Sequence, residues 1–139
     1  METNFEIEDN YAIRINGRLI DLHNNFDFIG LTDNLENNSI QLTFSKSSGN
    51  WVQKNEYSEI TFILSNLTYK HFIEADSVEF PEDARCLSDI SFFPSDLREI
   101  NDSITDQRKP NENDDLLFLF QDGKVIRVNC KKTEALIKE

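Results

Sequence analysis

Apolar and polar residues alternate on both sides of Asn16-Gly17 in the stretch YAIRINGRLIDL. An Asn-Gly pair favours a two-residue type I′ turn, because both central residues of that turn take positive φ. Such a turn pairs Ile15 with Arg18 and Ile13 with Ile20, which gathers the apolar side chains on one face. The pattern predicts a half-buried β-hairpin.

The stretch DDLLFLFQDGKVIRVNC, residues 114–130, predicts a second hairpin. Asp122-Gly123 is again a favoured pair for a two-residue turn. With a loop of that length, Leu119 lies opposite Ile126, and the side chains of both point to a wholly apolar face.

The first strand of this hairpin, Leu116–Phe120, is apolar on both faces. A strand of that kind is typical of the inside of a sheet with cover on each side, whereas its partner strand is expected to be half exposed. The same register places Phe118 opposite Arg127, whose side chain is expected to run along the ring with its guanidinium in water.

Shorter alternating runs between the hairpins predict further strands. A bulge or bend is expected at Asn66, and residues 26–31 fit either a strand or a packed loop. The predicted strands cover residues 39–45, 51–54, 58–65, 67–75 and 90–94.

Signals for helix are few. Within residues 95–104, Asp96 stands three residues before Glu99 in a capping-box spacing, and apolar residues follow at helical intervals, which predicts a short amphipathic helix. Residues 80–87, with a proline near the start, and residues 131–139 are further candidates for a helical turn or two.

These elements predict a single domain over residues 1–139 that is mainly β, with an α+β arrangement left open. Its core is expected to be an antiparallel sheet in a sandwich or partly open barrel, with one or two short helices. Eleven phenylalanines support this preference for strands. Residues 102–115 are polar, contain Pro110 and lack apolar periodicity, which predicts a mobile surface loop.

The formal net charge of -12 changes the range of expected partners. Residues 124–139 carry five basic and two acidic residues, so the preceding chain, with nine basic and twenty-four acidic residues, has a charge of -15. Like charges repel, so nucleic acid and anionic membranes are not expected as partners, and a basic protein is.

The first ten residues lack the basic and apolar regions of a signal peptide, so a cytoplasmic location is expected. Cys86 and Cys130 are too few for a disulfide scaffold. In a reducing compartment they are expected to act as small buried apolar groups.

Motifs that would indicate catalysis or a cofactor are missing from the sequence. It contains no nucleophile elbow, phosphate-binding loop, dinucleotide fingerprint or zinc motif, so neither an enzyme nor a cofactor nor a metal is expected. His23 and His71 are interpreted as surface or partly buried strand residues. A role as general base or metal ligand needs a partner that the fold alone can supply.

The run NENDDLLFLFQD has the spacing of a calcium loop in its first three ligand positions, Asn111, Asn113 and Asp115. Leu116 then stands where such a loop requires glycine, and Asp122 stands where it requires a bidentate glutamate. The calcium site is therefore rejected.

Two groups of carboxylates are candidates for a binding surface. They serve either to keep the protein soluble or to dock a basic protein, since clustered charge raises association rates. The first group is Glu74, Asp76, Glu79, Glu82 and Asp83. The second group is Glu99, Asp102, Asp106, Glu112, Asp114 and Asp115.

Aromatic residues near these acids fit either the core or the centre of an interface. Trp51, just past a Ser-Ser-Gly-Asn turn, is the aromatic most expected to be partly exposed, and it joins the first acidic group as a candidate partner-binding residue. The other three are Tyr69, Phe72 and Phe80.

The segments IQLTFSKSSGNW, EITFILSNLTYKHF and LLFLFQDGKVIRVNC give the chain its resemblance to a known class. The chain resembles small, acidic, β-rich bacterial proteins that include the immunity proteins of polymorphic toxin systems. The resemblance implies a non-enzymatic protein that binds and blocks a cognate toxin domain, often a basic one. It transfers no functional residue to a position in this sequence.

Three functions therefore remain as hypotheses. The first is a protein-binding module, in its finer form an immunity protein that neutralises a toxin through an acidic surface. The alternative is a small β-barrel-like protein that binds an apolar ligand beside Leu116–Phe120. The third is an enzyme that uses carboxylates and His71. An edge strand that pairs two copies into a homodimer is also left open.

Overall fold

The computed structural model describes residues 1–76 and 80–139 and confirms a mainly β protein. Its main sheet runs in the order β5-β6-β7-β10-β9-β8, all antiparallel, and β1 adds to β10 in parallel. The strands are β1 (Glu2–Thr3), β5 (Phe26–Asn34), β6 (Ser39–Lys46), β7 (Glu59–Ile73), β8 (Leu87–Pro94), β9 (Asp114–Phe120) and β10 (Val125–Lys138).

A second, three-stranded sheet contains the first predicted hairpin. It consists of β2 (Glu6–Glu8), β3 (Ala12–Ile15) and β4 (Arg18–Asp21). Asn16 and Gly17 have φ values of 52° and 80°, as the type I′ turn requires. The predicted pairs of Ile15 with Arg18 and Ile13 with Ile20 are confirmed.

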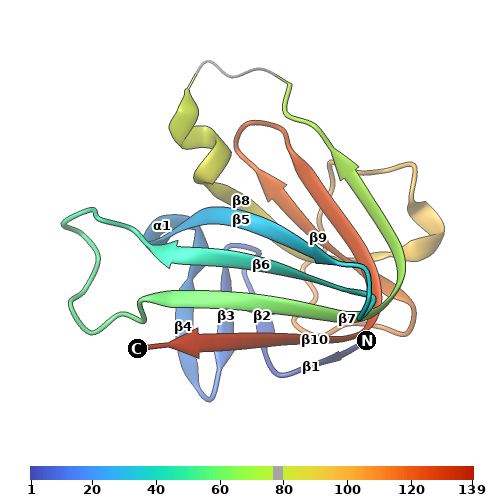
Figure 1. Cartoon of the computed structure of the whole chain (residues 1–139), viewed down its shortest axis with the longest axis horizontal. Coiled ribbons are helices and arrows are strands. Elements are labelled where there is room, and N and C mark those ends of the chain that lie inside the picture. The colour runs from blue at the N-terminus through green and yellow to red at the C-terminus, as the bar shows by residue number, and fades with distance from the viewer. Residues whose placement is uncertain (77–79) are drawn as a thin grey trace.

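The main sheet curls into a half-barrel because two long strands change direction together. In Figure 1, β7 and β10 pass through the lower part of the sheet and then turn upward into the part that contains β9 and β8. The irregular backbone predicted at Asn66 is confirmed, since this residue has a φ of 59°. The bulge itself lies two residues later: Leu67 pairs with Cys130 and Tyr69 with Asn129, so Thr68 is the extra residue of β7.

Phenylalanine side chains fill the inner face of the curled sheet. Phe62 meets Phe5, Phe44 and Phe118 edge-on, with ring centroids 5.4 to 5.8 Å apart. Isoleucines from β2, β3 and β4 join the same buried cluster, so the small sheet covers the inner face of the large one. The protein's own side chains thus occupy the apolar surface that a ligand-binding barrel would present.

Three short helical turns complete the chain: α1 (Leu22–Asn25), η1 (Pro81–Arg85) and η2 (Ser95–Leu97). The proline-led turn is where the sequence predicted it. The helix predicted over residues 95–104 is wrong beyond η2. The helical turn predicted over residues 131–139 is also wrong, because β10 continues to Lys138. Residues 26–31 belong to β5, and the strand predicted over residues 51–54 lies in the β6–β7 loop.

The β9–β10 hairpin has a different turn from the predicted one. The Phe120 amide donates to the Lys124 carbonyl at 3.0 Å, so three residues, Gln121 to Gly123, form the loop. Gly123 takes a φ of 90°, the left-handed conformation that ends such a loop. The extra residue moves the register by one position and places Phe118, not Leu119, opposite Ile126.

This shift overturns the prediction for Arg127. Its side chain points to the outer face with Leu117 opposite, and it is fully buried instead of reaching water. Its guanidinium contacts Asp115 and the chain that runs over this face from Pro94 to Asn101. The start of β10, which was predicted to be half exposed, is therefore buried. Strand β9 is covered on both faces, as predicted.

The polar segment predicted as a mobile loop lies along the free side of β8. The Asn10 side chain donates to the carbonyls of Ile90 and Thr105, and the Thr105 amide donates to the Ser91 hydroxyl. The irregular chain ends before Asp114, where β9 begins, so the last two residues of the predicted loop are strand. The mobility of the segment stays a prediction.

Candidate docking surface

The end of the β9–β10 hairpin stands between two shallow grooves that share Gly123. One groove, of about 400 Å³, is lined by Asp76, Asp83 and Asp122 with Phe80 beside them. The other, of about 310 Å³, is lined by Glu99 and Asp102 together with apolar side chains of β7 and β10. We call these five carboxylates the acidic rim.

Backbone contacts hold two of the rim residues, Asp76 and Asp122, in place. The Asp76 amide donates to the Asp122 carbonyl at 3.1 Å, and the Asp122 carboxylate accepts from the Lys124 amide at 3.0 Å. A Cβ atom at Gly123 would lie 2.5 Å from a carboxylate oxygen of Asp76. The close approach of the two chain segments thus depends on glycine at the tip of the turn.

One lysine lies within this surface, but its charge already has partners inside the molecule. The Lys124 ammonium donates to the Ala84 carbonyl at 3.1 Å and stands 3.9 Å from the Asp122 carboxylate. It also lies over the rings of Phe120 and Phe28, at 4.6 and 5.2 Å. The exposed side of the rim therefore keeps an excess of negative charge.

The structure separates the residues of the first predicted acidic group. Asp76 and Asp83 line one groove, and Phe80, 57% exposed, lies next to them. Glu74 and Glu82 are exposed on adjoining segments of the same chain, but they do not line that groove. Glu79 lies outside the described residues.

Trp51 does not belong to the acidic rim. It is 64% exposed, as predicted, and its indole N–H donates to the Asn24 carbonyl at 2.8 Å. It lines a different groove with Leu19 and Glu56, at the end of the molecule formed by the β6–β7 loop. The Trp51 ring is thus held in one position on a separate surface.

The second predicted acidic group also divides. Glu99 and Asp102 join the acidic rim, which sequence reasoning missed because it treated the two groups as separate. Asp114 is buried and accepts from the Asn111 amide and the Gln107 side chain. The remaining two exposed acids, Asp106 and Glu112, are not among the residues that line the two grooves.

Asp115 has a structural position beneath the surface. Burial raises the pKa of its carboxyl group, but hydrogen bonds from Arg98, Arg127 and Asn129 outweigh that effect and hold the pKa below its ordinary value. Charged partners on two sides keep this buried carboxylate ionised. Asp115 is therefore not available to a partner protein.

The histidines do not form a catalytic pair within the described chain. His23 Nδ1 lies 2.7 Å from the Leu87 carbonyl and 3.6 Å from Cys86 Sγ. A carbonyl only accepts, so Nδ1 carries the proton and cannot take one from the thiol. Burial, with Asp83 and Asp27 nearby, raises the pKa of Cys86, which disfavours the reactive thiolate.

His71 lies on the outer face of β7, with its ring centroid 6.4 Å from that of Tyr69. Among the described residues, no hydrogen bond or ion pair joins it to a carboxylate. The arrangement that a carboxylate–histidine base would need is not found at this position.

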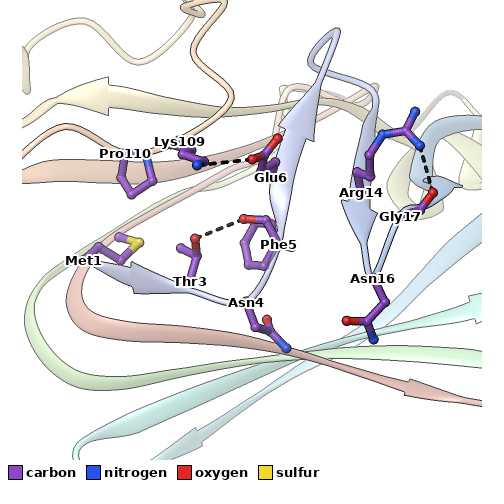
Figure 2. A pocket seen from close by; sticks show the side chains of 10 residues that line it. All are labelled: Met1, Thr3, Asn4, Phe5, Glu6, Arg14, Asn16, Gly17, Lys109 and Pro110. Atoms are coloured by element: carbon purple, nitrogen blue, oxygen red, sulfur yellow. Dashed lines mark hydrogen bonds and ion pairs between the residues drawn. The ribbon is translucent and has the colours of Figure 1, made fainter.

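A more voluminous hollow than these two grooves lies elsewhere, between the N-terminal strands, the β3–β4 turn and residues 109–110. It has a volume of about 660 Å³ and opens widely to solvent. Figure 2 shows Phe5 in its wall, with Lys109 directed toward Glu6 and Arg14 toward the carbonyl of Gly17. Lys109 is 3.5 Å from Glu6, and Arg14 also pairs with Glu8, so the cations of this pocket have partners within the chain.

No helix in the described part of the chain is long and apolar enough to cross a membrane. Residues 1–76 and 80–139 bring no three His, Cys, Asp or Glu side chains together in a way that could hold a metal ion.

Comparison with known proteins gives no family. No protein-family model, no curated protein and no solved structure matches the chain.

Proposed function

We propose that this protein is a non-enzymatic binding module that docks a basic protein through the acidic rim. The observation that carries the proposal is the convergence of acids from three chain segments around one tight turn. Asp76 follows β7, Asp83 belongs to η1, and Glu99 and Asp102 follow η2.

The rim has the composition of a steering surface with an apolar anchor. A cluster of negatively charged carboxylates raises the rate at which the protein encounters a basic partner, and it disfavours acidic partners. Phe80 is exposed beside the groove that holds three of these acids. A large exposed ring within a charged border is typical of the central contact of an interface.

A lysine octapeptide labelled with a fluorophore is a direct probe of this surface. Fluorescence anisotropy at low salt would measure its affinity for the wild-type protein and for the double variant Asp76→Lys/Asp83→Lys. We expect the double variant to bind about tenfold or more weakly, and we expect wild-type binding to weaken as salt screens the charges.

The matched control is Glu36→Lys/Glu112→Lys, which changes the net charge by the same amount at exposed positions that line neither groove. It should weaken binding by less than about threefold, because screening limits the reach of a distant charge. Equal losses in both double variants would show a diffuse field without a docking site, and the proposal would fail.

In its finer form, the proposal is that the basic partner is a toxin domain and that this protein is its immunity protein. The acidic rim would cover the partner's active site and so block it. The gene next to this one tests this form. If that gene encodes a secreted toxin, the basic terminal domain of the toxin should bind the wild-type protein. It should not bind the Asp76→Lys/Asp83→Lys variant.

If the adjacent toxin domain binds the wild-type protein and the double variant equally well, the acidic rim is not the surface that binds the toxin. The alternative of an apolar-ligand barrel stays a prediction. No described cavity favours it, since the phenylalanines of the core occupy the inner face of the sheet.

A further inference from the structure

The upper part of β7 is a strand edge whose outward backbone groups have no partner among the described residues. From Tyr69 to Ile73, β7 pairs only with β10. On its other side, β6 reaches no further than the pair of Ser39 with Ser65. Figure 1 shows this part of β7 continuing upward beyond the end of β6.

The direction of the backbone groups follows from the hairpin register. The Lys124 carbonyl faces β9, where it accepts from Phe120. Backbone groups alternate along an antiparallel strand, so Val125 and Arg127 face β7. Their partners are Ile73 and His71.

The N–H and C=O groups of the intervening residues, Lys70 and Phe72, must then point away from the sheet. Both side chains are exposed, and Phe72 has 42% of its surface accessible. A lysine on an edge strand can prevent another strand from pairing with it. The Lys70 ammonium, however, donates to the Asp33 carboxylate at 2.7 Å. The edge is therefore open to another strand.

Several other edges of the described chain are covered or interrupted. The Asn10 carbonyl accepts from the Ile90 amide along β8, and the Arg108 carbonyl accepts from the Ile7 amide along β2. Asn4 uses its side-chain amide like a strand residue, bonding both backbone groups of Ala135 in β10. Edge strand β5 carries a bulge between Phe28 and Gly30. The open stretch of β7 contrasts with this pattern.

The surroundings of the edge select the occupant by charge. Ile73 lines the same groove as Glu99 and Asp102 on the outer face, and Phe72 is on the opposite face of the strand. Side chains alternate between faces, so an incoming strand would place one set beside acids and the other beside an aromatic ring. A second copy, with a net charge of -12, would bring like charges together.

We propose that the β7 edge at Lys70–Phe72 receives an extended segment of the basic partner as an added strand, with basic residues on the outer face and apolar residues beside Phe72. This inference rests on the proposed function and specifies how the partner is held. Backbone pairing would supply affinity, and the acids and the ring would supply selectivity.

The test uses an octapeptide of alternating valine and lysine, blocked at both ends. Its control is the same peptide with alternate amides N-methylated, which keeps charge and side chains but removes strand pairing on one edge. We expect at least tenfold weaker binding of the methylated peptide. We also expect the unmethylated peptide to slow hydrogen exchange at the amides of Lys70 and Phe72.

Two substitutions at one position separate backbone from side chain. Phe72→Pro removes an outward N–H, a change that an edge strand tolerates, and should weaken binding of the valine–lysine peptide at least tenfold. Phe72→Ala keeps the N–H and should weaken it less than Phe72→Pro does. If Phe72→Pro does not fold, the exchange protection in the wild-type protein decides the question.

The outcomes distinguish this inference from the proposed function. Binding that is insensitive to N-methylation and leaves the Lys70 and Phe72 amides unprotected would overturn the added strand while leaving the acidic rim in place. No binding of either the lysine octapeptide or the valine–lysine peptide would overturn both. A free protein that sediments as a dimer with these amides already protected would make the occupant a second copy, against the inference.

Discussion

The Nε atom of Arg127 lies 2.7 Å from a carboxylate oxygen of Asp115, and neither side chain is exposed to solvent. Three further guanidinium N–H groups donate to the carbonyls of Pro94 and Ile100 and to the side chain of Asn101. The pair thus fastens the segment after β8 to the outer face of β9 and β10. The same segment continues into Asp102, which contributes to the acidic rim.

Arg127→Met should destabilise the protein strongly, because it leaves Asp115 buried with one charged partner fewer. A buried pair broken on one side costs about 3–5 kcal/mol of unfolding free energy. Urea denaturation followed by circular dichroism would measure it. The control is Lys70→Met, which breaks an exposed pair and should cost less than about 1 kcal/mol. Similar losses in the two variants would contradict the structural role given to Arg127.

The pH dependence of stability should contain a contribution from Asp115. The folded-state pKa of its carboxyl lies below the value of about 3.9 expected for the unfolded chain. The contribution is therefore fully present above that unfolded value and is lost as pH falls through the folded-state pKa. Unfolding free energy measured between about pH 5 and pH 2 should fall less steeply in Asp115→Asn than in the wild type. Asp106→Asn, at an exposed position, should keep the wild-type slope.

Gly123→Ala should destabilise the β9–β10 turn by about 1–3 kcal/mol, since a Cβ is disfavoured at positive φ. The new methyl would also meet the Asp76 carboxylate. Gly30→Ala is the control, because a Cβ there meets nothing within 4 Å and the φ is not positive. Thermal unfolding would compare them. A Gly123→Ala protein as stable as Gly30→Ala would argue against the left-handed residue and the register that depends on it.

Hydrogen exchange will show how mobile the segment along β8 is. The Thr105 amide donates to Ser91, and its carbonyl accepts from the Asn10 side chain. We expect a protected Thr105 amide in the wild type. Asn10→Gly keeps the positive φ of that position but removes the side-chain amide. Loss of hydrogen bonds worth about 1.4 kcal/mol should speed exchange about tenfold. Fast exchange at Thr105 in the wild type would instead favour the mobile loop predicted from sequence.

Cys86 should react slowly with iodoacetamide near pH 8. Its raised pKa leaves less thiolate than an ordinary cysteine has, and the thiolate is the reactive form. Asp83→Asn should speed the reaction, since it removes one of the charges that raise the pKa. The alkylation rate measured by mass spectrometry, relative to the unfolded protein, checks both statements. A rate above that of the unfolded protein would reopen the question of an active nucleophile.

Only part of the acidic rim could be predicted from the sequence. Asp76 and Asp83 are close along the chain, so their grouping could be predicted from charge alone. Their meeting with Glu99 and Asp102 could not, because it depends on where the segment after β8 is fastened by Arg127. Trp51 was predicted to be exposed, but its distance from the rim depends on how the sheet curls.

By itself, the sequence determined the strand-rich fold, the type I′ turn at Asn16-Gly17 and the bend at Asn66. These features depend on side-chain alternation and on local backbone preferences, which act between neighbours in the chain. Only the tertiary structure decided which face Arg127 occupies. A loop longer by one residue exchanges the two faces of a strand relative to its partner, so the choice between a two-residue and a three-residue turn depends on which side chains the whole sheet buries. The open edge of β7 also depends on the tertiary structure, because it exists only where β6 ends and β7 continues.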